Sequence, residues 1–208
     1  MKKAVLLIIL AGIIIRLLGI DSVLYNDEAA WGYGLRDNNS YPAMVNQIPH
    51  LPLALYVLKG LASVFNYATG GFRAAALLFG IINSILVYKL AKSEFGEKAA
   101  FWSVFVMMFS FWPFLASLQV DMEGSILAFF FISTIYSFLN YEKTKEAKWL
   151  AISSLLFLLA MLTKITALLI PAILGIYLVI TRRSFVQPLK MLLPVVLPGA
   201  MAFLLFSY

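Results

Sequence analysis

The sequence predicts an all-α polytopic membrane protein of about seven transmembrane helices, with an interfacial helix in a long first external loop. Two observations carry this prediction. Hydrophobic residues make up 62% of the chain and charged residues only 12%, whereas soluble domains average about 45–50% apolar residues. Several apolar runs also reach the roughly 17–25 residues that a helix needs to cross a bilayer. A water-soluble fold would have to expose these runs.

The spans follow from apolar runs and their polar breaks. The first run follows Met1-Lys2-Lys3 and lacks a small-x-small cleavage site, so we expect it to be retained. As one helix, Trp149 to Ile180 would be about 48 Å long, beyond a bilayer core of about 30 Å. We therefore divide it at Thr163-Lys164. The predicted spans lie near residues 4–20, 72–90, 99–118, 124–139, 149–163, 165–180 and 191–208, which together form a single module, 1–208.

The long loop at 21–71 contains one further apolar segment, 51–65, which is short and carries Lys59 and Gly60. Its apolar residues follow helical spacing, and its polar residues lie off that stripe. These features predict an amphipathic helix lying in the membrane interface. Loops of such length are usually functional or disordered, and the aromatic content of this loop favours the first.

The charge distribution predicts a cytoplasmic N-terminus, because basic residues concentrate on the cytoplasmic side of membrane proteins. With seven spans, that side holds 11 of the 16 basic residues, chiefly in clusters at 89–98, 143–148 and 182–190. Counting 51–65 as a crossing would reverse this bias. These clusters also account for the net charge of +6, so no nucleic-acid partner is expected. The chain contains no cysteine and hence no disulfide or thiol chemistry.

In this topology, unusual polar residues gather at the non-cytoplasmic face. They are Asp27, Glu28, His50, Arg73, Asp121, Glu123 and Lys164. Each has a structural alternative: the acids could cap or solvate helices, and the basic residues could reach toward lipid head groups. We expect that second role for Arg16. As a set, the residues favour chemistry, since a carboxylate can act as a base and cations can stabilise a phosphate leaving group.

Five motifs then resemble one family in order and spacing. Tyr25-Asn26-Asp27-Glu28-Ala29-Ala30 resembles the acidic loop motif of the GT-C glycosyltransferases, closest to the branch of protein O-mannosyltransferases and the aminoarabinose transferase of lipid A. Pro49-His50-Leu51-Pro52-Leu53 resembles that branch's H/K-P-P-L motif, with Leu51 in place of the first proline. The other three resemblances are at 71–80, at 119–123 and at Ala160-Met161-Leu162-Thr163-Lys164.

The resemblance implies an inverting transferase that moves a sugar from a polyprenyl-phosphate donor to a lipid, glycan or protein acceptor outside the cytoplasm. Asp27 would be the base, with Glu28 beside it as a second catalytic carboxylate. His50, Arg73 and Lys164 would surround the donor phosphate. Asp121 would help position the acceptor or a metal, with Glu123 in the binding site. No cofactor is certain, and a divalent metal between Asp27 and Asp121 is an open alternative.

Two other classes remain as alternatives. One is a non-catalytic lipid-phosphate-binding or assembly subunit of the same architecture. The other is a small transporter of a lipid-linked anion, although inverted repeats or charges at the membrane midplane, typical of transporters, are not evident. Family members usually continue for several more spans. We therefore expect either a truncated transferase or a chain whose missing C-terminal region comes from a partner subunit.

Overall fold

The computed structural model describes residues 2–21, 27–37, 52–120, 122–182 and 186–206, and every regular element among them is helical. The chain divides into two compact units. The first comprises residues 1–50 and 54–129, and the second comprises 51–53 and 130–208. The predicted all-α class is confirmed for the described residues.

In the first unit, α1 (Lys2–Leu17) is followed by α2 (Asp27–Asp37) and α4 (Pro52–Val64), which lies mostly in this unit. The α4 helix falls within the segment predicted at 51–65. Three residues of the predicted apolar stripe, Leu55, Leu58 and Ala62, are buried. Its position at a membrane interface remains a prediction. Phe65, which follows the helix, is 51% exposed and departs from that stripe.

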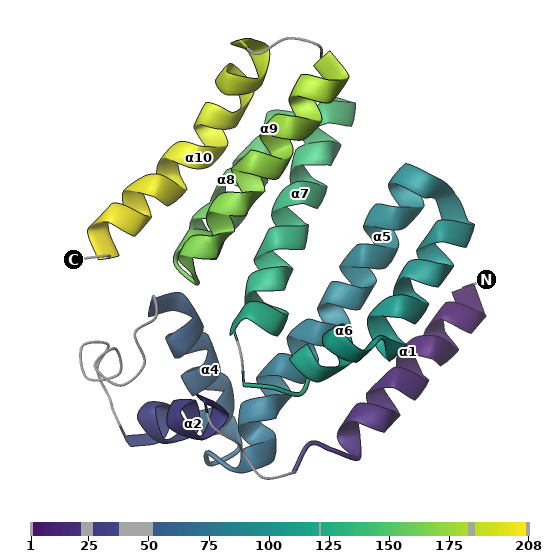
Figure 1. Ribbon diagram of the computed structural model, residues 1–208, viewed down its shortest axis with the longest axis vertical. Helices are drawn as coiled ribbons and strands as arrows, with labels where there is room; N and C mark the ends of the chain where they lie inside the picture. The colour runs from purple at the N-terminus through teal and green to yellow at the C-terminus, as the bar shows by residue number, and fades with distance from the viewer. Residues whose placement is uncertain (1, 22–26, 38–51, 121, 183–185, 207–208) are drawn as a thin grey trace. The chain divides into compact units, whose positions relative to one another are not determined.

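Helix α5 (Thr69–Phe109) contains a sharp turn at Gly96, where φ is +86°. Only glycine adopts this backbone conformation without a steric cost. Lys92 forms an ion pair with Glu97, which also accepts a hydrogen bond from Tyr88 at 3.0 Å across the turn. The turn thus produces two helical arms, and it lies within the charged cluster that separates two predicted spans (Figure 1).

Helix α1 packs on the second arm of α5 through a cluster of Val5, Val104 and Met108. That arm ends at Phe109, and α6 (Phe111–Ala116) follows after an extended residue, Ser110. Pro113 explains the break, because a proline ring clashes with the carbonyl four residues earlier in a continuing helix. The helix therefore breaks at Ser110 inside the span predicted at 99–118, and the span itself remains a prediction. A π-helix, η1 (Met122–Ile126), then precedes α7 (Leu127–Thr144).

The second unit contains most of α7 together with α8 (Ala147–Met161), the 3₁₀ turn η2 (Ile165–Leu168), α9 (Leu169–Arg182) and α10 (Val186–Phe206). Helix α8 ends at Met161, so the chain breaks where the long apolar run was divided. Helix α10 packs closely on α8, where a Cβ added at Gly199 would lie 2.5 Å from the Phe157 ring. Ser153 of α8 donates to the Thr134 carbonyl of α7 at 3.1 Å.

Two helices among the described residues are long and apolar enough to cross a membrane, Thr69–Phe109 and Gly124–Thr144. Four further apolar helices are shorter, with the bounds Pro52–Val64, Ala147–Met161, Ile165–Thr181 and Met191–Leu205. The number of crossings, predicted as seven, remains a prediction.

Candidate functional site

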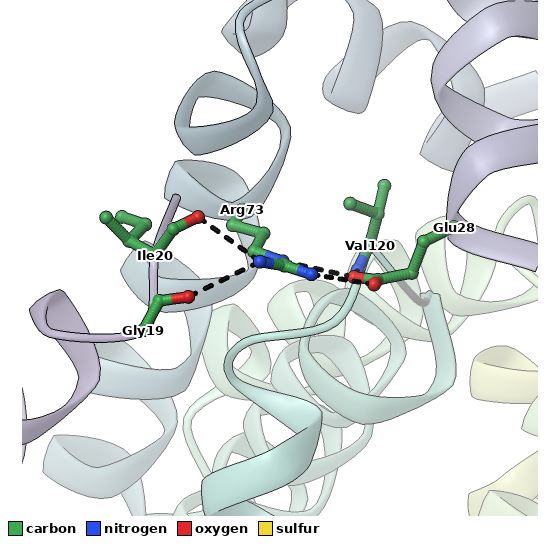
Figure 2. Close-up of polar contacts among 5 residues, drawn as sticks. All are labelled: Gly19, Ile20, Glu28, Arg73 and Val120. Carbon is green, nitrogen blue, oxygen red and sulfur yellow. Dashed lines mark hydrogen bonds and ion pairs between the residues drawn. The ribbon is translucent and has the colours of Figure 1, made fainter. Parts of the chain in front are cut away.

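The site begins with an ion pair between Arg73 and Glu28, drawn in Figure 2. Arg73 Nη2 lies 2.9 Å from Glu28 Oε2, and Arg73 Nε lies 3.3 Å from Glu28 Oε1. The side chains are only 6% and 12% exposed. Two parallel contacts of this kind fix both the distance and the plane of the two groups.

Three backbone groups complete a cluster that we call the Arg73–Glu28 hub. Arg73 Nη1 donates to the carbonyl oxygens of Gly19 and Ile20, each at 3.3 Å. The Val120 N–H donates to Glu28 Oε1 at 3.0 Å. The hub therefore joins the turn after α1, the start of α2, the start of α5 and the segment before η1 (Figure 2).

Local structure explains why these groups meet. The turn that follows α1 at Leu17 presents the carbonyl oxygens of Gly19 and Ile20 to the guanidinium of Arg73, next to the helix end where carbonyl groups lack partners within the helix. A cation is favourable at that negative end of a helix dipole, and a carboxylate is favourable at a positive end. Glu28 occupies the second position of α2, so both charges sit at helix ends that stabilise them.

Arg16 forms a second buried cluster in the same unit, and the expectation that it reaches toward head groups is wrong. The residue is 2% exposed. Its guanidinium donates to Ser117 Oγ and to the carbonyl oxygens of Gly12, Met107 and Met108. It also lies 4.8 Å from the centre of the Phe114 ring. The carbonyls near the end of the second arm of α5 thus provide the acceptors that head groups would otherwise supply.

Of the other predicted site residues, Lys164 has extended backbone angles between α8 and η2. Two residues before it, the carbonyl of Leu162 accepts the Leu53 N–H at 3.2 Å, within the second unit. The last residue of the motif at 49–53 is therefore paired with the middle residue of the motif at 160–164. His50, Asp121, and the side chains of Asp27 and Glu123 lie outside the described residues.

The hub nevertheless constrains the chain beside both acidic motifs. Glu28 directly follows Asp27, and Val120 directly precedes Asp121. The hydrogen bond between the Val120 N–H and Glu28 Oε1 therefore joins the neighbours of two predicted catalytic carboxylates. A rigid support of this kind is what a catalytic carboxylate needs to keep a productive geometry.

Sequence reasoning missed the groups that hold η1 in place. Asn83 Nδ2 donates to the Ser125 carbonyl at 2.9 Å, and both residues are buried. A Cβ at Gly124 would lie 2.5 Å from the Cβ of Ala116, and one at Gly80 would lie 2.6 Å from the Cβ of Ser117. Hydrophobic periodicity gives no signal for such close approaches. Polar residues such as Asn83 inside an apolar run were the available signal.

Within the described ranges, no three histidine, aspartate or glutamate residues cluster in a way that would hold a metal ion. The metal prediction involves Asp27 and Asp121, whose side chains are not among those described. It therefore remains a prediction.

The chain is strongly apolar, and its described residues are helical and include two helices long and apolar enough to cross a membrane. The sequence profile of the dolichyl-phosphate-mannose-protein mannosyltransferase family matches residues 49–207, and the chain belongs to this family. Its members are membrane glycosyltransferases that use lipid-linked sugar donors. The match includes His50, Arg73, Asp121, Glu123 and Lys164, and it begins after the acidic motif at 25–30. No curated protein and no solved structure matches the chain.

Proposed function

We propose that the chain transfers a sugar from a polyprenyl-phosphate donor to an acceptor hydroxyl at the non-cytoplasmic face of the membrane, with inversion. The observation that carries this proposal is the Arg73–Glu28 hub, which ties the residue after Asp27 to the residue before Asp121. Family membership supplies the class of reaction. The buried hub supplies a reason for two acidic motifs, far apart in sequence, to act together.

In the proposed reaction, Asp27 accepts the proton of the acceptor hydroxyl. The hydroxyl oxygen attacks the anomeric carbon from the face opposite the phosphate, which inverts that carbon. The bond between the anomeric carbon and the phosphate oxygen breaks, and its electron pair leaves with the lipid phosphate. This leaving group needs little protonation, so a base and neutralising cations are the main requirements.

We assign neutralisation of the phosphate to His50 and Lys164, and placement of the acceptor to Asp121 and Glu123, as the resemblance implies. Arg73 and Glu28 take a different part. Their charged groups are nearly buried and bind each other and the backbone. We therefore propose them as positioning residues that hold the two acidic motifs, in place of direct contact with the phosphate or the reacting hydroxyl.

The test is transfer of labelled sugar from polyprenyl-phosphate donors into the lipid, glycan and protein fractions of membranes that contain the chain. Asp27→Asn removes the base and keeps the size of the side chain. General-base catalysis contributes about 10²–10⁴-fold, so transfer should fall at least about 100-fold. Asp37→Asn, at an exposed acid of the same helix, should leave transfer within about twofold, well below that loss.

Donor binding separates this proposal from a non-catalytic role. Asp27→Asn should retain the affinity for the polyprenyl-phosphate sugar while losing transfer. Unchanged transfer by this variant would remove Asp27 from the mechanism. Donor binding with no transfer by the unmodified chain, in membranes where the transfer assay works, would support a lipid-binding subunit in place of an enzyme.

A further inference from the structure

An apolar groove in the first unit lies beside the hub and is not used by the proposed reaction. Its volume is about 590 Å³. Its walls come from α1 and the turn after it (Leu17, Ile20) and from the first arm of α5 (Ala74, Leu77, Leu78, Ile81). These positions on α5 repeat at three- and four-residue intervals, so they lie along one face of the helix.

The groove is polar at one end only. Asp21, from the turn after α1, and Asn66, from the turn after α4, line it together with Phe65 and Gly70 near the start of α5. The end of α1 and the start of α5 lie together in the first unit (Figure 1). From there, the lining residues of both helices become purely apolar. A groove graded in this way matches an amphiphile with its head at one end and its chain along the helix.

Three local features shape the polar end. Asn66 has a positive φ of 52°, a left-handed conformation that asparagine tolerates well. A Cβ at Gly70 would lie 2.5 Å from Asp21 Oδ1, so the missing side chain makes room for the carboxylate. A Cβ at Gly71 would lie 2.6 Å from the Cβ of Phe65. The two glycines thus let a carboxylate and an aromatic ring approach the first turn of α5.

The charge of the residues that line the groove indicates which lipid head group would bind there. No lysine, arginine or histidine is among the described residues that line the groove, whereas Asp21 contributes a negative charge. A lone anionic head at that end would be repelled by the carboxylate without a compensating cation. An ammonium group would pair with Asp21 and donate hydrogen bonds to it and to Asn66.

The length of the groove indicates which kind of lipid tail would fit it. From Gly70 to Ile81, α5 rises about 16 Å at 1.5 Å per residue. This matches one leaflet of a hydrocarbon core about 30 Å thick. The dimensions suit one acyl chain of a bilayer lipid, which occupies a single leaflet.

We propose that this groove is a binding site for an aminophospholipid of the surrounding bilayer, with its primary ammonium group at Asp21 and one acyl chain against α5. Lipid binding at this site does not require sugar transfer. A lipid bound there would support the turn at 18–21, which carries the carbonyls that bind Arg73.

Native mass spectrometry of the purified chain, released from detergent with defined lipids, tests the proposal. The probes are dioleoyl phosphatidylethanolamine, phosphatidylcholine and phosphatidylglycerol, which share their chains and differ in the head. Phosphatidylethanolamine should be retained about tenfold more than the other two, which is about 1.4 kcal/mol. Equal retention of all three would overturn the proposal.

Two variants locate the binding. Asp21→Asn keeps the shape of the polar end and should reduce the preference for phosphatidylethanolamine to about twofold or less, while Asp37→Asn, the matched exposed acid, should keep it. Leu78→Trp fills the apolar part and should reduce retention of all three lipids. A preference that survives Asp21→Asn, or retention that survives Leu78→Trp in a variant with unchanged helix content, would contradict the assignment.

Two further measurements separate this site from the donor site. Asp27→Asn, which should abolish transfer, should bind phosphatidylethanolamine as the unmodified chain does. Failure of the transfer assay therefore leaves the lipid proposal standing, and the reverse also holds. Displacement of phosphatidylethanolamine by an equimolar polyprenyl phosphate would overturn the proposal and assign the groove to the donor.

Discussion

At the scale of single residues, two arginines in the first unit show how a low-dielectric environment changes the role of a charge. Arg16 and Arg73 are 2% and 5% exposed, and both use backbone carbonyls near helix ends as acceptors. Within the described part of the chain, Arg73 also pairs with a carboxylate, that of Glu28. The sequence predicted that Arg73 belongs to the site. It could not predict the partner, because the pairing depends on how four separate segments meet.

Arg73→Ala should lower the free energy of unfolding strongly, because it leaves the Glu28 carboxylate buried without its cation. Removing one partner of a buried ion pair costs about 3–5 kcal/mol. Arg36→Ala is the matched control, since the Arg36–Asp37 pair is about half exposed and such pairs contribute about 0–1 kcal/mol. Denaturant or thermal unfolding of the purified chain in detergent measures both.

The double variant Glu28→Ala/Arg73→Ala completes this test. Because the two residues interact directly, the double variant should be less destabilised than the sum of the single variants. Additive losses, or equal losses for Arg73→Ala and Arg36→Ala, would show that the hub does not stabilise the fold.

At the scale of elements, the sequence predicted the positions of helices better than their interruptions. Charged residues at 89–98 indicated where α5 turns, and the length of the run at 149–180 indicated the break before Lys164. Ser110 and η1 were missed. The first depends on a steric clash of Pro113 with the preceding turn, and the second on the close packing of Gly124 against Ala116. Neither changes the apolar periodicity from which spans are inferred.

Glycine substitutions distinguish close packing from simple helix propensity. Gly124→Ala would place a Cβ 2.9 Å from the Cα of Ala116 and 3.0 Å from its carbonyl oxygen, both backbone atoms. Overpacking of this kind costs about 1–3 kcal/mol. Gly60→Ala meets nothing within 4 Å, so alanine should stabilise α4 by up to about 1 kcal/mol.

The same unfolding measurement checks both glycine variants. The two substitutions add the same methyl group, but only at Gly124 does it meet backbone atoms. The changes in the free energy of unfolding are therefore expected to have opposite signs. A Gly124→Ala variant at least as stable as the unmodified chain would mean that η1 and α6 do not approach as closely as the structure describes.

At the scale of the whole molecule, family membership and apolar composition establish a membrane protein, whereas the orientation is inferred from charge alone. Prediction of the candidate site also relied on the order of motifs along the whole chain. The motif order indicated which residues belong together, and the buried ion pair of the hub is the basis for proposing Glu28 and Arg73 as positioning residues.

The absence of native cysteine allows a direct test of orientation. Ser63 and Ser93 are both exposed and lie at positions expected on opposite sides of the membrane. A membrane-impermeant maleimide applied to intact spheroplasts should label Ser63→Cys and should label Ser93→Cys only after permeabilisation. The reverse pattern would invert the topology and place the hub at the cytoplasmic side.

The hub also imposes an order on the biogenesis of the chain. Glu28 is separated from Arg73 by 45 positions and from Val120 by 92. At a synthesis rate of about 5–20 residues per second, roughly 5–20 s pass between the emergence of Glu28 and that of Val120. Until Arg73 emerges, about halfway through that interval, the carboxylate must remain hydrated or be held by the insertion machinery. The hydrogen bond from the Val120 N–H can form only when that last segment arrives, so the hub is complete only after residue 120 has been synthesised.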